Sequence, residues 1–437
     1  MIITSIPQMF KDFFCTITKN VVKDEDSWLC EYIWRFVLTL ACLEGRASLT
    51  KISACTGHWR TRQSMVNFLI ADWDERGALL KAAMATLKQL GWQEGDPLYL
   101  ALDDTQVQKR ASVMEGVSKM FLHAEKRYAH GHDVVLASIV YRGVAIPYAL
   151  RLWTSEEKCK ELNESGQPII FQKITELAAD CVRSFFADVS RKVTVLFDSY
   201  YLCKAVIDAC NDKNFFYLGV VKSNRVIKET KDSKKGNQVG VYSSGYLANK
   251  GRSYNVAGST VKHKIAGLVC YLRKVGTVKV VFCRRKGDNQ IITLATNDLE
   301  CGVKRVVEIY RNRWQIEVLF KSAKQKLGMG DYQFLKRRAV DKYLHLVMIS
   351  HLFLTHLACK ELNEKSSENA TKPICLAGIS KTKEYLRNIL LLNEINQIKP
   401  DSRSNVAVRV TEEIKEKIGV LLTKKDDYTN LKDNISC

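Results

Sequence analysis

The 437-residue sequence predicts an α/β protein in which a mixed sheet with a β-rich insertion follows a helical N-terminal domain. Three observations lead to this prediction. Apolar residues recur at helical spacing through much of residues 1–95, and β-prone and helix-prone segments alternate over residues 98–221. A region rich in Gly, Ser, Val and Tyr then occupies residues 236–296. Strands and helices differ in the period at which apolar side chains recur, so these patterns separate the two kinds of element.

Residues 1–95 are expected to be helical, and one pattern within them is typical of DNA-binding modules. Between two apolar helical stretches, residues 49–57 and 58–66 have the pattern helix, glycine turn, helix. Arg60 and Arg62 would open the second helix, the position from which helix-turn-helix modules contact bases and phosphates. Many helical hairpins with no ligand also carry Gly in the turn, so the pattern leaves both interpretations open. Residues 91–97 form a boundary rich in helix breakers.

The next segment, residues 96–225, is expected to form the first part of a sheet core. Its predicted order is strand, strand, strand, helix, strand, helix, strand. The segments are 98–103, 133–141, 144–153, 169–187, 193–198, 202–210 and 215–221. Three antiparallel strands followed by crossover units would place the first and fourth strands side by side.

Two of these predicted strands end on carboxylates. Leu98–Asp103 alternates apolar residues up to the pair Asp103-Asp104, and the run 193–197 is closed by Asp198. An aspartate that closes a strand can also be only a turn or helix-capping residue. The pattern alone therefore leaves the function of each acid open.

A third carboxylate lies in the run 308–324, which reads as one long helix. At about 100° per residue, Tyr310, Arg313, Glu317 and Lys324 fall within roughly a 60° arc. A separate apolar face can pack on a sheet. The alternative is a solvated helix face that carries an ordinary Arg–Glu pair at i,i+4.

The spacing Y-x2-R-x3-E-x6-K resembles the signature of bacterial insertion-sequence transposases of the DDE class, in the hairpin-forming cut-and-paste branch. The resemblance implies a ribonuclease-H-like core in which Asp103, Asp198 and Glu317 are catalytic and share two Mg²⁺ ions, with Mn²⁺ as a possible substitute. The family's first acid usually reads D-x-T or D-x-S, which selects Asp103 and leaves Asp104 as the alternative.

The same resemblance implies that residues 1–95 bind the DNA ends, and it assigns roles to the other helical residues. Arg313 would pair with a phosphate near the scissile bond, and Tyr310 and Lys324 would position the DNA end through phosphate contacts. Hard cations such as Mg²⁺ prefer oxygen ligands, and two of them can activate the attacking oxygen and stabilise the leaving one.

Three further segments complete the expected organisation. Residues 226–297 are a β-rich insertion between the second and third acids, and residues 298–360 are the second part of the core. Residues 361–437 are helix-prone and of obscure role. Positive charge at 228–235 and 284–286 belongs either to solvated loops or to DNA contacts.

Composition agrees with an anionic partner. The chain has 67 Lys and Arg against 47 Asp and Glu, a net charge of +20, which predicts salt-sensitive binding. The 14 cysteines show no zinc spacing and no signal peptide is recognised, so we expect reduced thiols in the bacterial cytoplasm. The apolar stretch 343–359, with His345, His351 and His356, predicts a core helix rather than a membrane span or a metal site. His123, His130 and His132 are expected in a loop and a strand start.

The leading hypothesis is a transposase that binds the terminal inverted repeats of an insertion sequence as a homodimer, cleaves the strand at each end and transfers it to target DNA. It would be associated with the nucleoid when bound to double-stranded DNA, and no membrane partner is expected. A nuclease or resolvase of the same fold is one alternative. A catalytically silent, domesticated DNA-binding protein is another.

Overall fold

The structure is a computed structural model that describes residues 7, 10–21, 28–110, 113–122, 125–185, 193–365 and 378–397. Contacts divide the chain into two compact units, residues 1–89 with 322–437 and residues 90–321. We call the first the helical unit and the second the sheet unit, and each is described by itself. The boundaries of the five segments predicted from the sequence remain predictions.

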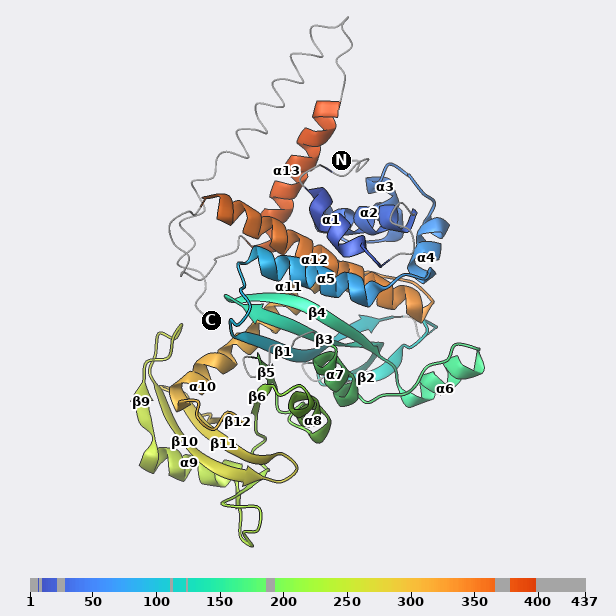
Figure 1. Ribbon diagram of the computed structural model, residues 1–437. Helices are drawn as coiled ribbons and strands as arrows, with labels where there is room; N and C mark the ends of the chain where they lie inside the picture. Colours follow the sequence, from blue (N-terminus) through green and yellow to red (C-terminus); the bar gives the residue numbers. More distant parts are fainter. Residues whose placement is uncertain are drawn as a thin grey trace, which may run out of the picture. The chain divides into compact units, whose positions relative to one another are not determined.

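The helical unit is built around one long buried helix. Its helices are α1 (Lys11–Thr18), α2 (Trp28–Cys42), α3 (Leu49–Cys55), α4 (Arg62–Ile70), α5 (Glu75–Gln89), α12 (Arg337–Lys365) and α13 (Ile379–Gln397). Helix α12 packs against α2, α4, α5 and α13 (Figure 1). The N-terminal helices and the C-terminal part of the chain therefore share one core.

The prediction of a core helix at 343–359 is confirmed, because this segment lies within α12. His345 is fully buried and His351 is nearly so. Among the residues that the structure describes, no helix is both long and apolar enough to span a membrane.

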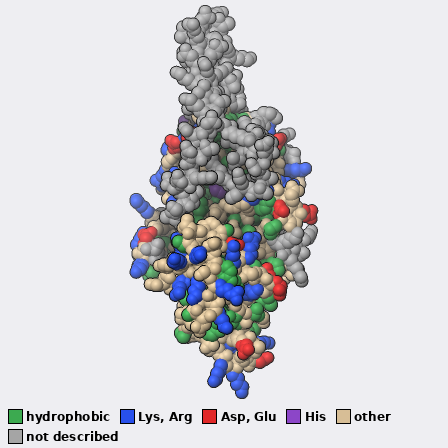
Figure 2. Space-filling model, turned by 90° about the vertical axis from the view of Figure 1, so that its left-hand side faces the viewer, with side chains coloured by type: hydrophobic (Ala, Val, Ile, Leu, Met, Phe, Trp, Pro, Cys, Tyr) green, Lys and Arg blue, Asp and Glu red, His purple; other side chains and the backbone are tan. Residues whose placement is uncertain are grey.

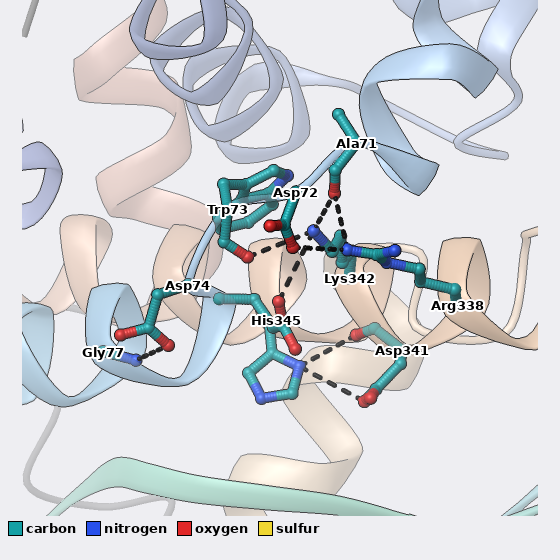
Figure 3. Close-up of polar contacts among 10 residues, drawn as sticks. Ala71, Asp72, Trp73, Asp74, Gly77, Arg338, Asp341, Lys342 and His345 are labelled. Atoms are coloured by element: carbon teal, nitrogen blue, oxygen red, sulfur yellow. Dashed lines mark hydrogen bonds and ion pairs between the residues drawn. The ribbon is translucent and has the colours of Figure 1, made fainter. Parts of the chain in front are cut away.

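A buried lysine ties α12 to the segment that joins α4 to α5. The Nζ atom of Lys342 donates hydrogen bonds to the backbone oxygens of Ala71 and, at 3.1 Å, of Trp73, and it lies 4.7 Å from the Trp73 ring centroid. Figure 3 shows this cluster, in which Arg338 also reaches the Asp72 carboxylate at 2.8 Å. The Lys342 side chain is 2 % exposed and that of Asp72 is 88 % exposed, so only the lysine contacts are shielded from water.

Helix α13 gives the C-terminal region a structural role that the sequence did not reveal. Lys383, which is buried, donates to the backbone oxygens of Leu43 at 2.7 Å and Lys326 at 2.6 Å, and Arg387 donates to that of Cys42 at 2.9 Å. Carbonyls at helix C-termini lack intrahelical partners and attract cations. The two cations of α13 therefore stabilise the end of α2, and Lys383 also stabilises the end of α11 (Trp314–Lys326).

The sheet unit contains a single 12-stranded mixed sheet. The strand order is β2-β3-β1-β5-β6-β12-β11-β10-β7-β8, with β4 paired to β3 and β9 paired to β10. Strand β1 is antiparallel to β3 and parallel to β5, which is in turn parallel to β6. The bounds are β1 (Leu98–Lys109), β2 (Ser118–Leu122), β3 (Arg127–Tyr141), β4 (Val144–Trp153), β5 (Val193–Phe197), β6 (Phe216–Val220), β7 (Val226–Lys228), β8 (Asn237–Gln238), β9 (Arg252–Tyr254), β10 (His263–Leu272), β11 (Gly276–Arg285) and β12 (Ile292–Thr296).

Helices cover this sheet where its strands are apolar. Helix α7 (Ile174–Arg183) packs on β3 and β4, and α8 (Lys204–Asp212) packs on α7 and β6. Helix α10 (Val303–Tyr310) places Val306 and Val307 in a core with Leu196, Leu218 and Leu294 of the central strands. The predicted mixed α/β architecture with N-terminal helices is confirmed.

Several predicted elements need correction. Strand β1 does not end at Asp103 but continues to Lys109, because its backbone remains paired with β3 over that length. Strand β2 and helix α6 (Glu156–Glu164) were not predicted. His130 and His132 lie inside β3 rather than in a loop. His132 is buried, and its Nε2 atom lies 3.1 Å from the backbone oxygen of Glu115. His123 lies outside the described residues.

Residues 226–297, which the sequence predicts to be a β-rich insertion, contain strands β7 to β12. They also contain helix α9 (Val239–Lys250), whose packing on β10 and β11 was not apparent from composition. Their strands do not form a separate sheet, because β12 pairs with β6 and thereby extends the central sheet.

We predict that Lys342→Met lowers the free energy of unfolding by about 2–4 kcal/mol, because it removes the buried ammonium's hydrogen bonds to the two carbonyls and its 3.6 Å ion pair with Glu75 while it keeps the apolar stem. Asp72→Ala in the same cluster removes an exposed ion pair and should cost less than about 1 kcal/mol. Denaturant unfolding of both variants measures the difference. Equal, small losses would show that the lysine contacts contribute no more than a surface pair.

Candidate active site

The doubled aspartates lie in the middle of β1, at the point where its neighbour β5 ends. The last β1–β5 pair is Ala101 with Leu196. Asp103 and Asp198 each follow two residues later, so continuation of the register sets them at the same level. On the β5 side of β1, Asp103 therefore lies beyond the last paired residues.

Asp198 is held by a turn directly after β5. Its Oδ1 atom accepts hydrogen bonds from the backbone nitrogens of Tyr200 at 2.8 Å and Tyr201 at 3.4 Å. This is the local side-chain-to-backbone pattern by which aspartate stabilises turns. Asp198 therefore has the turn-stabilising role that the sequence analysis gave as its alternative, and its Oδ1 atom performs that role. The preceding Phe197 can occupy its place because Gly219 opposite it on β6 has no side chain: a Cβ there would lie 2.2 Å from the Phe197 ring.

The third carboxylate lies on a helix that is not continuous. The predicted single helix consists of α10, a 3₁₀ turn at Arg311–Arg313, and α11. The tighter turn changes the angular spacing assumed from the sequence. It nevertheless leaves Arg313 and Glu317 in contact, and the Arg313 guanidinium 5.9 Å from the Tyr310 ring centroid.

Arg313 connects the helix to β1. Its Nη1 atom donates to Asp103 Oδ2 at 2.9 Å, and its Nη2 atom donates to Glu317 Oε1. The Arg–Glu pair expected for an ordinary helix surface is therefore formed, but a carboxylate 210 residues away joins it. The Arg313 side chain is only 16 % exposed and that of Asp103 19 %, so this is a partly buried three-residue cluster.

The acids carry more negative charge than the one guanidinium compensates. Burial raises the pKa of Asp103 to about 7; Arg313 opposes this shift, and Asp104 and Asp198 add to it. Burial also raises the pKa of Tyr310 to about 12, although Arg313 opposes that change. Burial disfavours the charge of Arg313, but Tyr310, Asp103 and Glu317 outweigh it and raise its pKa.

Asp104 belongs to a different group of side chains. Its Oδ1 atom accepts a hydrogen bond from the buried hydroxyl of Tyr201. Asp133 of β3, which is 5 % exposed, lies opposite Gln106 and so falls on the Asp104 side of the strand pair. Because successive strand residues point to opposite faces, Asp103 and Asp104 are separated by the strand itself. Of these two aspartates, Asp103 is the one that contacts Arg313.

Asp133 and Tyr201 were not identified as site residues from the sequence. Burial raises the pKa of Asp133 to about 7, and the neighbouring Asp104 adds to this shift, so the two acids share negative charge in a shielded position. Burial likewise raises the pKa of Asp104, which Tyr201 partly opposes. No local motif marks this pair, because it forms only through the β1–β3 register.

The remaining predicted residues lie on helices. Lys324 is on α11, seven residues after Glu317, which at 100° per residue places both side chains on one stripe of that helix. In the helical unit, Arg62 is the first residue of α4 after the N-cap Thr61. Arg60 precedes the helix, and its guanidinium lies 4.5 Å from the Trp59 ring centroid.

The chemistry of the acids fits a divalent cation. Oxygens of Asp103 and Glu317 contact one guanidinium, so both carboxylates reach the same cation. Within the described residues, however, no three His, Cys, Asp or Glu side chains are gathered closely enough to hold a metal ion. Arg313 would have to release the two carboxylates before they could join Asp198 in one ligand set.

The β-rich part of the sheet unit carries exposed cations. Figure 2 shows Lys and Arg side chains grouped on the face that includes this part of the chain. Those with exposed side chains include Arg252, Lys262, Arg273, Arg285 and Lys286. A positive surface of this kind attracts polyanions with strong salt dependence.

Comparisons with known proteins agree with this geometry. A family model described as DDE superfamily endonuclease matches residues 36–262, a little over half of the chain, and includes Asp103 and Asp198. A second, described as Transposase DDE domain, matches residues 174–353 and includes Asp198 and Glu317. The chain is also 34% identical over 70 residues to a protein of Sinorhizobium fredii (strain NBRC 101917 / NGR234) named "Putative transposase y4zB". That match covers 16% of this chain and 20% of the relative, so the chain spans about a fifth of that protein. The chain belongs to the DDE superfamily of transposases and endonucleases.

Proposed function

We propose that the protein is a transposase that cleaves DNA at the terminal inverted repeats of an insertion sequence and transfers the freed strands to target DNA. The observation that carries this proposal is the Arg313 bridge between Asp103 on β1 and Glu317 on α11, in a chain that belongs to the DDE superfamily. The order of β1, β3, β4, β5 and β6, with a parallel β1–β5 pair, supports a ribonuclease-H-like core.

Asp103, Asp198 and Glu317 would hold two Mg²⁺ ions, for which Mn²⁺ can substitute. When bound, the ions would activate the attacking oxygen and stabilise the leaving oxygen of the phosphodiester. Glu317 and Asp103 would become available as Arg313 turns toward a DNA phosphate, which offers the same guanidinium a bidentate partner. Tyr310 and Lys324 would contact the backbone of the same DNA end.

End recognition would belong to the N-terminal helices, with Arg60 and Arg62 next to the DNA. Two copies of the chain would pair the two ends of the element as a homodimer. Cleavage and strand transfer would act on double-stranded DNA in the bacterial cytoplasm.

Two alternative functions follow from the same geometry. A nuclease or resolvase would use the same acids without strand transfer. A silent DNA-binding protein would retain the fold alone, although the Asp103–Arg313–Glu317 cluster favours an active site. Short inverted repeats that flank the coding region would separate a transposase from both.

We predict that Asp103→Asn, Asp198→Asn and Glu317→Gln each reduce cleavage of end DNA by at least about a hundredfold, since each removes a charge that stabilises the transition state. Cleavage of labelled end duplexes in Mg²⁺ or Mn²⁺ measures the effect, and EDTA should abolish it. Binding in Ca²⁺ should remain within a few-fold of the unsubstituted protein.

The matched control for the first acid is Asp104→Asn, which keeps an oxygen that can accept the Tyr201 hydrogen bond. It should leave cleavage largely intact. The reverse pattern, with normal cleavage by Asp103→Asn and loss in Asp104→Asn, would make Asp104 the first ligand.

We predict that Arg313→Ala slows cleavage more than tenfold yet strengthens Mn²⁺ binding in the absence of DNA, because the guanidinium competes for Asp103 and Glu317. Calorimetric Mn²⁺ titration measures the binding. Loss of stability should stay within about 1–2 kcal/mol, because the cluster is only partly buried.

Lys304→Ala is the control for this variant, because Lys304 forms an i,i+4 pair at 3.6 Å with Glu308, whose side chain is 15 % exposed, on the neighbouring α10. It should change neither cleavage nor Mn²⁺ affinity. Weaker Mn²⁺ binding by Arg313→Ala would show that the guanidinium organises the acids rather than competing with a metal.

A further inference from the structure

Helices α2, α3 and α4 form a three-helix arrangement in which α4 is the third helix. Each of the three packs against the other two. Phe68 of α4 stacks on Tyr32 of α2, with ring centroids 4.9 Å apart, and also contacts Phe36 at 5.3 Å. Three-helix DNA-binding modules of this kind place their third helix in the major groove.

Helix α4 separates cleanly into two faces. Met65, Phe68 and Leu69 are buried and occupy an arc of about 100° on a helix that packs against α2, α3 and α12. The opposite face carries Gln63, Asn67 and Ile70, which are exposed, with half-buried Val66 at its edge and exposed Arg62 beside Leu69. Two amides and an aliphatic side chain therefore share one open face.

The types of residue on this face are those that read bases. Gln and Asn can form paired hydrogen bonds with the N6 and N7 positions of adenine, and aliphatic groups can contact the thymine methyl. Gln63 and Asn67 are one helical turn apart, and the Gln63 Nε2 atom donates to Asn67 Oδ1 at 3.1 Å. That bond orients both amides on the same part of the helix surface.

The surroundings of the face are cationic. Residues 45–71 contain Arg46, Lys51, Arg60 and Arg62 and no Asp or Glu. All four cations are exposed. A segment with this charge and no carboxylate is complementary to the phosphates on both sides of a DNA groove.

We propose that the exposed face of α4 enters the major groove of the DNA that this protein recognises, and that Gln63 and Asn67 determine its sequence preference by binding adenines. Val66, at the edge of the same face, contacts a thymine methyl in the same stretch. This inference rests on the proposed DNA-end recognition and adds the residues that read the bases. The alternative is a helix-surface amide pair that binds nothing.

The test is selection of bound sequences from a pool of random-sequence DNA duplexes by the full chain in Ca²⁺. The unsubstituted protein should enrich a motif that contains A·T pairs at neighbouring positions. Gln63→Ala and Asn67→Ala should each lose the preference at one or two of these positions while the rest of the motif remains. Alanine favours helix, so neither variant should melt earlier.

Affinities for the selected duplex and for variants with one A·T pair changed to G·C measure how strongly the protein discriminates at each position. The unsubstituted protein should discriminate by about 5- to 140-fold at the read positions, and the alanine variants by little at those positions. Replacement of the contacted thymine by uracil should weaken binding of the unsubstituted protein but not of Val66→Ala. Asn211→Ala, which removes an exposed amide from α8 of the sheet unit, is the matched control and should retain the full preference.

The outcomes separate this inference from the proposed function. A protein that enriches no motif would overturn sequence-specific end recognition and the assignment to α4 with it. A protein that enriches a motif which Gln63→Ala and Asn67→Ala both reproduce would overturn the assignment to α4 alone. A face of α4 protected instead by a second copy of the chain would contradict it as well.

Discussion

The candidate site depends on one interaction, the contact of the Arg313 guanidinium with two carboxylates from opposite ends of the sheet unit's sequence. Asp103 lies on β1 and Glu317 on α11, and the guanidinium that contacts both offsets their mutual repulsion. The planar fork of arginine suits this position because it satisfies both partners at once.

The central strands of the sheet provide the rigid frame for this cluster. Parallel pairing of β1 with β5 stops at Ala101 and Leu196, which brings Asp103 and Asp198 to the same level. The site is costly in free energy, since burial and neighbouring acids raise the pKa of Asp103 and of Asp133 to about 7. Above that pH both carboxyls are ionised in the folded chain. Each then lowers the free energy of unfolding, because its pKa is lower in the unfolded chain. Such local conflicts with stability are common where a protein binds a cation or a substrate.

The sequence predicted those parts of the fold and site that depend on local period. The contact of Arg313 with Glu317 follows from helical spacing, and Asp198 follows from the apolar run that ends before it. The 3₁₀ turn at 311–313 could not be predicted, because no Pro or Gly marks it. The extension of β1 to Lys109 and the Asp104–Asp133 pair also escaped prediction. Both depend on pairing with β3, and the register between two strands cannot be deduced from either segment alone.

Metal-directed cleavage of the protein backbone tests the central claim most directly. Fe²⁺ that replaces Mg²⁺ reduces added hydrogen peroxide to a hydroxide ion and a hydroxyl radical, itself becoming Fe³⁺, and the radicals cut the chain next to the residues that hold the ion. Mass spectrometry of the fragments should locate cuts near Asp103, Asp198 and Glu317, and excess Mg²⁺ should suppress them. Cuts near Asp104, Asp133 and Tyr201 without any near Glu317 would contradict the account, because the metal would then occupy the opposite face of β1.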